Sequence, residues 1–198
     1  MSVNNPLDCL RHLFHFFTDS RVRTVPPFEI ASSHQVPPPF QELLVHKHHM
    51  TVTLEKYFGL PVALKVLGRN RGSQEYARLI QLLLEGTNQV VEFGIFHMDL
   101  SVCRAELQAE ILEERTPLGH ILMRHDVLRI IEPWAFLRFP PGPQVASWFE
   151  MESPYPTYGR LARIVCDGSE AIELLEVVRP EPAKLTHRTD QMPDALSD

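Results

Sequence analysis

The sequence predicts an α+β domain in which one antiparallel β-sheet is covered by helices. The strand-like segments occur mostly as adjacent pairs joined by short turns, as in residues 75–100 and 159–178. Helix-like segments separate these pairs. The chain has 198 residues, and a single domain of that size buries roughly 70% of its unfolded surface. One domain is therefore the simplest organisation.

An N-terminal extension, residues 1–40, is expected to precede this domain. Apolar residues recur at helical spacing in residues 7–18, which predicts a short amphipathic helix. The following stretch "VPPFEIASSHQVPPPF" is rich in Pro and Ser and is typical of an extended connector. A short helix is expected around residues 39–45, at the start of the main domain.

Two hairpins are expected in the first half of the main domain. The segments "TVTLEKYF" (51–58) and "PVALKVLGRN" (61–70) look like strands, and Gly59-Leu60 between them is a turn signal. The segments "EYARLIQLLLE" (75–85) and "QVVEFGIFHMDL" (89–100) flank the turn "GTN".

Two helices should follow these hairpins. Residues 101–114 place apolar side chains on one side, and Ser101 is a candidate N-cap. The segment "TPLGHILMRH" predicts a second helix, because Thr116 is a good N-cap and Pro117 suits the first helical turn.

The last part of the domain should return to strands. "VLRIIEPWAFLRF" predicts a strand interrupted at Pro133, and "PPGPQVASWFEMESPYP" predicts a proline-rich loop. "GRLARIVCDG" and "EAIELLEVV" predict a hairpin that turns at Asp167-Gly168. The main domain is expected to span residues 40–180, followed by a polar, disordered tail at 181–198.

Composition and charge narrow the classes of partner. The net charge of −6 argues against nonspecific nucleic-acid binding, which needs a basic surface. A local arginine can still bind a small anion. Three widely spaced cysteines indicate reduced thiols, and no apolar run reaches the 18 residues of a membrane span. We expect a cytoplasmic protein that contacts neither nucleic acid nor membrane.

Strand alternation places charged residues on otherwise apolar faces. Arg78 shares a face with Ile80 and Leu82, and Glu176 shares one with Leu174. Such an arginine needs an anionic partner. Two interpretations stay open. Arg78 and Glu176 could form an ion pair, or they could line a pocket in which Arg78 binds a ligand carboxylate. Glu92 is a weaker case, because a one-residue slip would turn it to the other face.

Three histidines, His46, His48 and His49, lie within four positions. They are too close in sequence to form a tetrahedral metal site by themselves. We interpret them as the polar end of a helix and expect no metal ligands among them. A metal-dependent hydrolase that uses this cluster is the weakest functional alternative.

Four segments in this order, "HMTVTLEKYFG", "EYARLIQ", "RTPLGHIL" and "ELLEVVRP", resemble the chorismate lyase (chorismate pyruvate-lyase, 4-hydroxybenzoate synthase) family. The similarity is to the branch with archaeal, mycobacterial and many bacterial members, and it covers residues 40–180. It implies a sheet of about six antiparallel strands, helices on one side, and a buried ligand site covered by helical flaps. It also implies no cofactor and a monomer or weak dimer.

The resemblance also implies roles for particular residues. Arg78 and Glu176 match the family's ligand-binding and catalytic arginine and glutamate. The substrate-binding positions that the resemblance gives are Met50, Thr51, Arg78, Leu118, Gly119 and Glu176. Glu176 would hold a ring hydroxyl or, as an acid with a raised pKa, assist the departure of the enolpyruvyl group. Much of the rate could instead come from holding chorismate in a reactive conformer.

The first functional hypothesis is therefore a chorismate pyruvate-lyase that forms pyruvate and 4-hydroxybenzoate, or a closely related hydroxybenzoate. The alternative is a non-catalytic protein that binds a small aromatic or carboxylic acid, similar to the effector domains of bacterial regulators with this fold. No DNA-binding domain of adequate length is expected before residue 40, which favours a stand-alone binding protein within that alternative.

Overall fold

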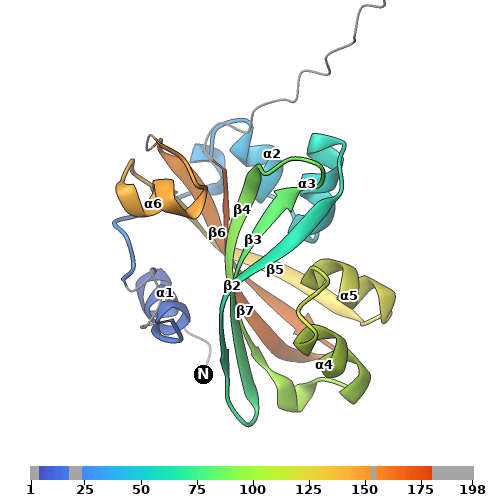
Figure 1. Ribbon diagram of the computed structural model, residues 1–198. Coiled ribbons are helices and arrows are strands. Elements are labelled where there is room, and N and C mark those ends of the chain that lie inside the picture. Colours follow the sequence, from blue (N-terminus) through green and yellow to red (C-terminus); the bar gives the residue numbers. More distant parts are fainter. Residues whose placement is uncertain (1–4, 18–23, 153–154, 180–198) are drawn as a thin grey trace, which may run out of the picture.

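Seven strands form one antiparallel sheet in a computed structural model that describes residues 5–17, 24–152 and 155–179 (Figure 1). The strand order is β1-β5-β6-β7-β4-β3-β2. The strands are β1 (Glu29–Ala31), β2 (Val62–Arg71), β3 (Glu75–Leu84), β4 (Val90–Asp99), β5 (Arg129–Phe139), β6 (Thr157–Cys166) and β7 (Ser169–Val178). The α+β prediction is confirmed. The extra strand is the three-residue edge strand β1, which pairs with β5 and lies where a connector was predicted.

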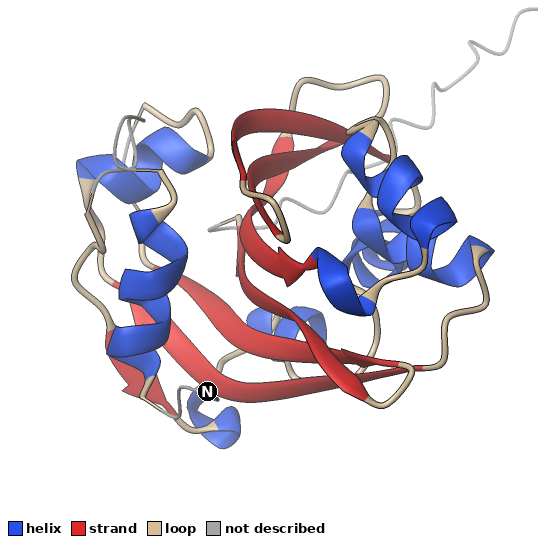
Figure 2. Cartoon of the chain, turned by 90° about the horizontal axis from the view of Figure 1, so that it is seen from below, coloured by secondary structure: helices blue, strands red, loops and turns tan. Residues whose placement is uncertain are grey.

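Helices fill the connections between the strands (Figure 2). The described helices are α1 (Pro6–His15), α2 (Phe40–Leu44), α3 (Met50–Phe58), α4 (Ala105–Leu112), α5 (Leu118–Arg124) and α6 (Pro143–Trp148), with single 3-10 turns η1 (Ser33–Gln35) and η2 (Leu100–Val102). Helices α2 to α5 cover one face of the sheet, as the resemblance implied. On the opposite face, α1 and α6 pack against a third apolar cluster.

The cluster under α1 and α6 ties the N-terminal helix to the domain. Leu10 and Leu13 of α1 are fully buried in it. The Trp148 ring of α6 stacks on Phe93 of β4 with 4.3 Å between ring centroids. Because Gln81 Nε2 also donates to the Trp148 carbonyl oxygen at 2.8 Å, α6 is fixed to β3 by a buried polar contact. The predicted proline-rich loop therefore contains a helix that forms part of the core.

Residues 50–58 form helix α3, so the strand predicted there is wrong. The β-branched residues at positions 51–53 produced the strand signal. The buried residues Met50, Leu54 and Phe58 instead recur every four positions, which is helical spacing. Gly59 at φ 69° then ends the helix in the left-handed conformation, and its N–H donates to the Glu55 carbonyl. Burial of this stripe outweighed the local strand preference.

The two predicted helix caps also differ from the structure. Helix α4 has Arg104 rather than Ser101 at its N-cap, because Ser101 belongs to the preceding turn η2. Helix α5 has Pro117 at its N-cap and begins at Leu118, one residue later than the Thr116 cap would require. The turn η2 delays the start of α4.

Three other sequence signals hold. The β6–β7 hairpin turns at Asp167 (φ 50°) and Gly168 (φ 88°), both of which lie in the left-handed region that a type I′ turn needs. Strand β5 is interrupted as expected, with a register shift between Pro133 and Ala135. The β3–β4 hairpin is present around Gly86. The predicted tail, 181–198, lies outside the described residues.

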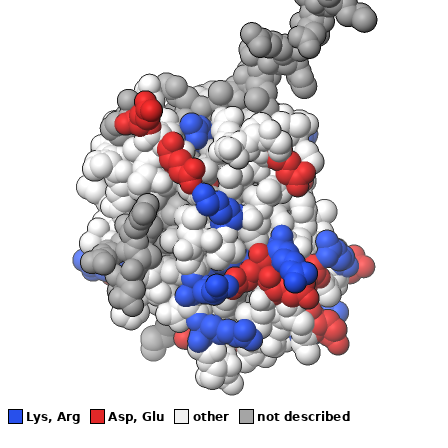
Figure 3. Space-filling view, viewed as in Figure 1, with Lys and Arg blue, Asp and Glu red and all other residues white. Residues whose placement is uncertain are grey.

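The surface mixes charges of both signs. Figure 3 shows Lys and Arg side chains beside Asp and Glu side chains on the face drawn. Arg69 pairs with Glu114 at 2.5 Å, and Arg124 pairs with Glu110. Within the described ranges no helix is long and apolar enough to cross a membrane, since a span needs about 20 residues.

Candidate ligand-binding site

A pocket lies between the sheet face formed by β3, β4 and β7 and the first turns of α3 and α5. Its free volume is about 60 Å³, which is room for only a few water molecules. A ligand must therefore be small, or α3 and α5 must move apart. The six residues predicted to bind substrate all line this pocket: Met50, Thr51, Arg78, Leu118, Gly119 and Glu176. Their role in binding stays a prediction.

The register of the sheet builds the floor of the pocket. Arg78 of β3 lies opposite Phe96 of β4. One pleat further along, Gly94 of β4 lies opposite Glu176 of β7, which lies opposite Arg160 of β6. Because side chains on one face recur every second residue, these groups all point to the α3–α5 side.

Arg78 is a buried cation without a hydrogen-bond partner. Its side chain is fully buried, and none of its three guanidinium nitrogens has a partner among the described residues. Its Cζ atom lies 4.8 Å from the centroid of the Phe96 ring. Burial lowers the pKa of Arg78, but a guanidinium remains charged in proteins. The donors of Arg78 are thus available to an anion that enters the pocket.

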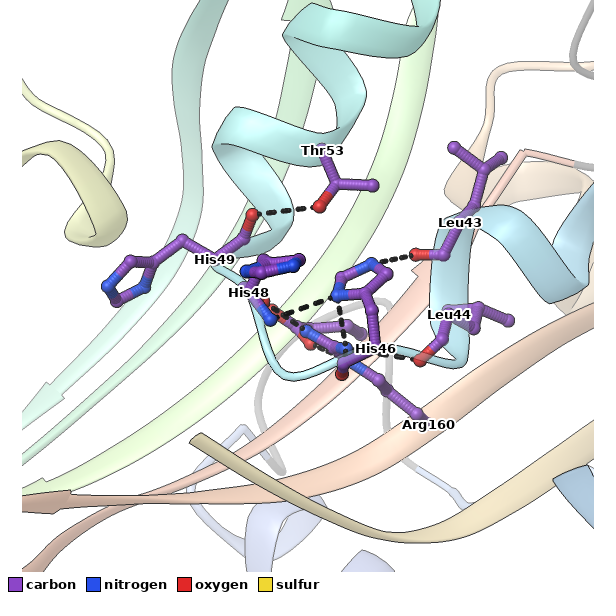
Figure 4. A network of polar contacts seen from close by, with 8 residues as sticks. Leu43, Leu44, His46, His48, His49, Thr53 and Arg160 are labelled. Atoms are coloured by element: carbon purple, nitrogen blue, oxygen red, sulfur yellow. Dashed lines mark hydrogen bonds and ion pairs between the residues drawn. The ribbon is translucent and has the colours of Figure 1, made fainter. Parts of the chain in front are cut away.

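Glu176 is held by Arg160, so the predicted alternative of an Arg78–Glu176 ion pair is wrong. The Arg160 Nε atom lies 2.5 Å from Glu176 Oε2. Arg160 is fully buried and also donates to the carbonyl oxygens of Leu44, His46 and His48 at 3.1, 2.9 and 3.2 Å. Figure 4 shows the Arg160 guanidinium beside Leu44, His46 and His48, which lie where α2 connects to α3. A buried pair with further hydrogen bonds balances the Glu176 charge.

Sequence reasoning missed Arg160, although a signal was present. In "GRLARIVC", strand alternation places Arg160 on the same face as Ala162 and Ile164. The argument that singled out Arg78 applies equally to this arginine. Only the register of β6 against β7 shows that Glu176 belongs to Arg160.

Glu92 lies in the same pocket with an unpartnered oxygen. The residue is 3% exposed, and its Oε2 atom has no hydrogen-bond partner in the described chain. Burial, and then the nearby charge of Glu176, raise the pKa of Glu92 well above the usual range. Both effects favour the protonated, neutral carboxyl group. Glu92, which the sequence indicated only as the weaker case of a charged residue on an apolar face, is therefore an acid with a raised pKa in this pocket.

The wall opposite the sheet depends on a close approach between α3 and α5. A Cβ atom at Gly119 would lie 3.0 Å from His49 Cβ and 3.1 Å from Thr51 Oγ1. The His120 ring also contacts the Glu55 carboxylate at 3.1 Å. Glycine at position 119 therefore allows the first turn of α5 to close over Met50 and Thr51.

The backbone of the histidine cluster supports Arg160, because the carbonyl oxygens of His46 and His48 accept its hydrogen bonds. His46 Nδ1 accepts from the His48 N–H at 3.1 Å, and its Nε2 lies 2.7 Å from the Leu43 carbonyl oxygen. Both ring nitrogens of His46 are thus engaged. The His49 ring points away from the other two (Figure 4) and contacts Arg129 Nε at 2.6 Å. Burial and nearby arginines lower the pKa of His46 and His49 to about 4.

A different group of side chains has the composition of a metal site. Among the described residues, His12, His97 and Glu173 each offer a ligand atom within 4.8 Å of the others. They lie on the opposite face of the sheet, on α1, β4 and β7. His12 Nδ1 already lies 3.2 Å from Glu173 Oε2, and Arg163 Nε lies 3.9 Å from Glu173 Oε1. An ion pair explains the same contacts, so we assign no metal to this group.

Comparisons with known proteins identify the fold. No family model and no curated protein sequence matches the chain. The effector domain of PhnF from Mycobacterium smegmatis is similar in structure, with a TM-score of 0.51 and 10% identity, over 68% of this chain and 90% of that one. A gene product of Staphylococcus aureus has a TM-score of 0.48 and 10% identity, over 66% and 89% of the two chains.

The C-terminal domain of the histidine utilization repressor from Pseudomonas syringae matches with a TM-score of 0.42 and 11% identity, over 65% of this chain and 98% of that one. At these identities the likeness shows the fold alone. The chain shares the fold of the PhnF effector domain, and its function has to be argued from its own pocket.

Proposed function

We propose that this chain is a binding module for a small organic acid that carries one carboxylate. The observation that supports this proposal is the guanidinium of Arg78, which is buried in the pocket without a hydrogen-bond partner among the described residues. A carboxylate can accept two parallel N–H donors from a guanidinium. The fold likeness to a domain described as an effector domain supports binding rather than catalysis.

The charges around the pocket support a single carboxylate. Arg160 balances Glu176, and Glu92 favours its neutral form. Arg78 is then the unbalanced charge of the lining that the structure describes. One ligand carboxylate would neutralise it, whereas a second would be buried near Glu176 without a cation, which is costly.

Calorimetry with benzoate as the probe tests this proposal. We expect saturable binding to the wild-type chain and at least a hundredfold weaker binding to Arg78→Met, which keeps an apolar chain of similar length. A matched control is Arg138→Met, which removes an exposed arginine that pairs with Glu29 and does not line the pocket. Equal binding to the wild type and to Arg78→Met, or no binding of benzoate and related monocarboxylates to the wild type, would refute the proposal.

A chorismate pyruvate-lyase is the second candidate function, and Glu92 is the observation that favours it. A buried neutral acid in the pocket could protonate the departing enolpyruvyl oxygen. The charges of the pocket favour the binding module, because chorismate carries two carboxylates and Arg78 can balance only one of them. Incubation with chorismate, with and without chelator, should release pyruvate and a hydroxybenzoate in equal amounts if the lyase is active. Arg78→Ala and Glu176→Ala should then abolish release.

A further inference from the structure

We propose that Glu92 is a specificity-determining residue, which donates a hydrogen bond to an uncharged oxygen at the end of the ligand remote from its carboxylate. The inference rests on the proposed function and deepens it. It names the ligand class as hydroxy- or oxo-substituted monocarboxylic acids, in preference to amino acids and dicarboxylic acids.

The sheet places Glu92 and Arg78 toward opposite ends of the pocket. Arg78 lies opposite Phe96, and Glu92 precedes Phe96 by four residues on β4. Four residues span about 13 Å along a strand. Both residues face the same side of the sheet and both line the pocket. A ligand anchored by Arg78 would therefore point its remote end toward Glu92.

Nothing in the described lining uses the hydrogen-bonding capacity of Glu92. Its Oε2 atom is buried and without a partner. Gly94, two residues further along, presents no side chain that could cover it: a Cβ atom there would lie 3.4 Å from Glu92 Oε1. Buried polar atoms are ordinarily satisfied in native structures. An unsatisfied carboxyl group that faces a cavity thus indicates a ligand group.

The charges near Glu92 determine which kind of ligand group this carboxyl group can bind. The Arg160 guanidinium, the cation whose charge opposes the raised pKa of Glu92, already pairs with Glu176 at 2.5 Å. His49, which also lines the pocket, has its pKa lowered to about 4 by burial and by nearby cations and so adds no positive charge at neutral pH. A neutral carboxyl group has one O–H donor. Its complement is a ligand hydroxyl or carbonyl oxygen.

Amino acids and dicarboxylic acids should bind weakly for different reasons. An ammonium group beside Glu92 would lose its hydration in the buried pocket, and the carboxyl group could balance it only by ionising next to Glu176. A second carboxylate would meet Glu176 with no free cation in the described part of the pocket. The site therefore separates ligands by the charge at their remote end, whereas Arg78 alone would accept all of them.

The test compares ring-matched aromatic acids by calorimetry: the monocarboxylates benzoate, 3- and 4-hydroxybenzoate, 4-formylbenzoate and 4-(aminomethyl)benzoate, and the dicarboxylate terephthalate. For the wild type we expect at least one oxygen-bearing ligand to bind tenfold or more tightly than benzoate. The aminomethyl ligand and terephthalate should bind more weakly than benzoate. Tighter binding of either charged ligand would overturn the inference.

Two variants isolate Glu92. Glu92→Gln keeps a donor and should retain the preference for the oxygen-bearing ligand. Glu92→Leu removes the donor and should reduce that preference to less than twofold. A preference that survives in Glu92→Leu, in protein shown to be folded by circular dichroism, would refute the inference. Arg78-dependent benzoate binding with no such preference in the wild type would refute it while leaving the proposed function intact. If the wild type binds none of these ligands, both the inference and the proposed function are refuted.

Discussion

Two fully buried arginines lie on the same face of the sheet, and they differ in what surrounds them. Arg160 on β6 pairs with the Glu176 carboxylate and donates to three backbone carbonyl oxygens. Arg78 on β3 has no hydrogen-bond partner among the described residues. A buried guanidinium whose donors are satisfied inside the protein is structural, whereas one whose donors face a cavity is available to a ligand. The contrast supports a structural role for Arg160 and the ligand-binding role that we propose for Arg78.

The largest expected effect on stability comes from Arg160. Arg160→Met would leave Glu176 and three carbonyl oxygens without their donor in the interior. Breaking a buried pair by removing one partner costs about 3–5 kcal/mol, and we expect a loss of that size in the free energy of unfolding, measured by urea denaturation. A loss below about 1 kcal/mol would show that the Arg160 network is not structural.

Arg78→Met should have the opposite effect on stability. It removes a buried charge that has no hydrogen-bond partner among the described residues, so we expect an unchanged or slightly higher free energy of unfolding. The two methionine variants form a matched pair in one denaturation series. Destabilisation of Arg78→Met as large as that of Arg160→Met would erase the distinction between the two arginines.

The close approach of α3 and α5 gives a further prediction, on the helical wall of the pocket that Arg78 lines. In Gly119→Ala the new methyl group would meet His49 and Thr51 at 3.0 and 3.1 Å, and overpacking costs about 1–3 kcal/mol. Thermal unfolding should detect this loss, together with weaker ligand binding. Gly142→Ala is the control, because a Cβ atom there meets only the Pro140 carbonyl oxygen, at 4.0 Å. Equal effects of the two substitutions would contradict this packing.

The pH dependence of stability should show the smallest effect. Because the pKa of Glu92 is raised in the folded state, the folded chain binds a proton that the unfolded chain releases above the ordinary glutamate pKa. Stability is therefore lost as pH rises from about 4.5 toward the raised value. His46 and His49, with pKa values lowered to about 4, act oppositely, since their contribution is lost as pH falls below about 6.5.

The difference between the wild type and Glu92→Gln isolates the carboxyl group, because both histidines are present in each protein. Urea denaturation at pH 5 and pH 8 should show Glu92→Gln gaining stability relative to the wild type at the higher pH. A difference that does not change with pH would mean that Glu92 titrates normally.

The pattern of alternating residues predicted part of this site. It placed Arg78, Glu176 and Glu92 on a buried face before any strand pairing was known, because side-chain direction depends only on position within one strand. It could not pair Glu176 with Arg160, since that contact depends on the register of β6 against β7. It also missed α3, because the β-branched residues at positions 51–53 favoured a strand over the helical spacing of Met50, Leu54 and Phe58.

The most direct test of the difference between the two arginines is a crystal structure of the chain with a bound monocarboxylate such as benzoate. We expect both carboxylate oxygens within about 2.7–2.9 Å of Arg78 guanidinium nitrogens, with Arg160 still paired to Glu176. A carboxylate bound away from Arg78, or one that displaces Glu176 from Arg160, would contradict the account.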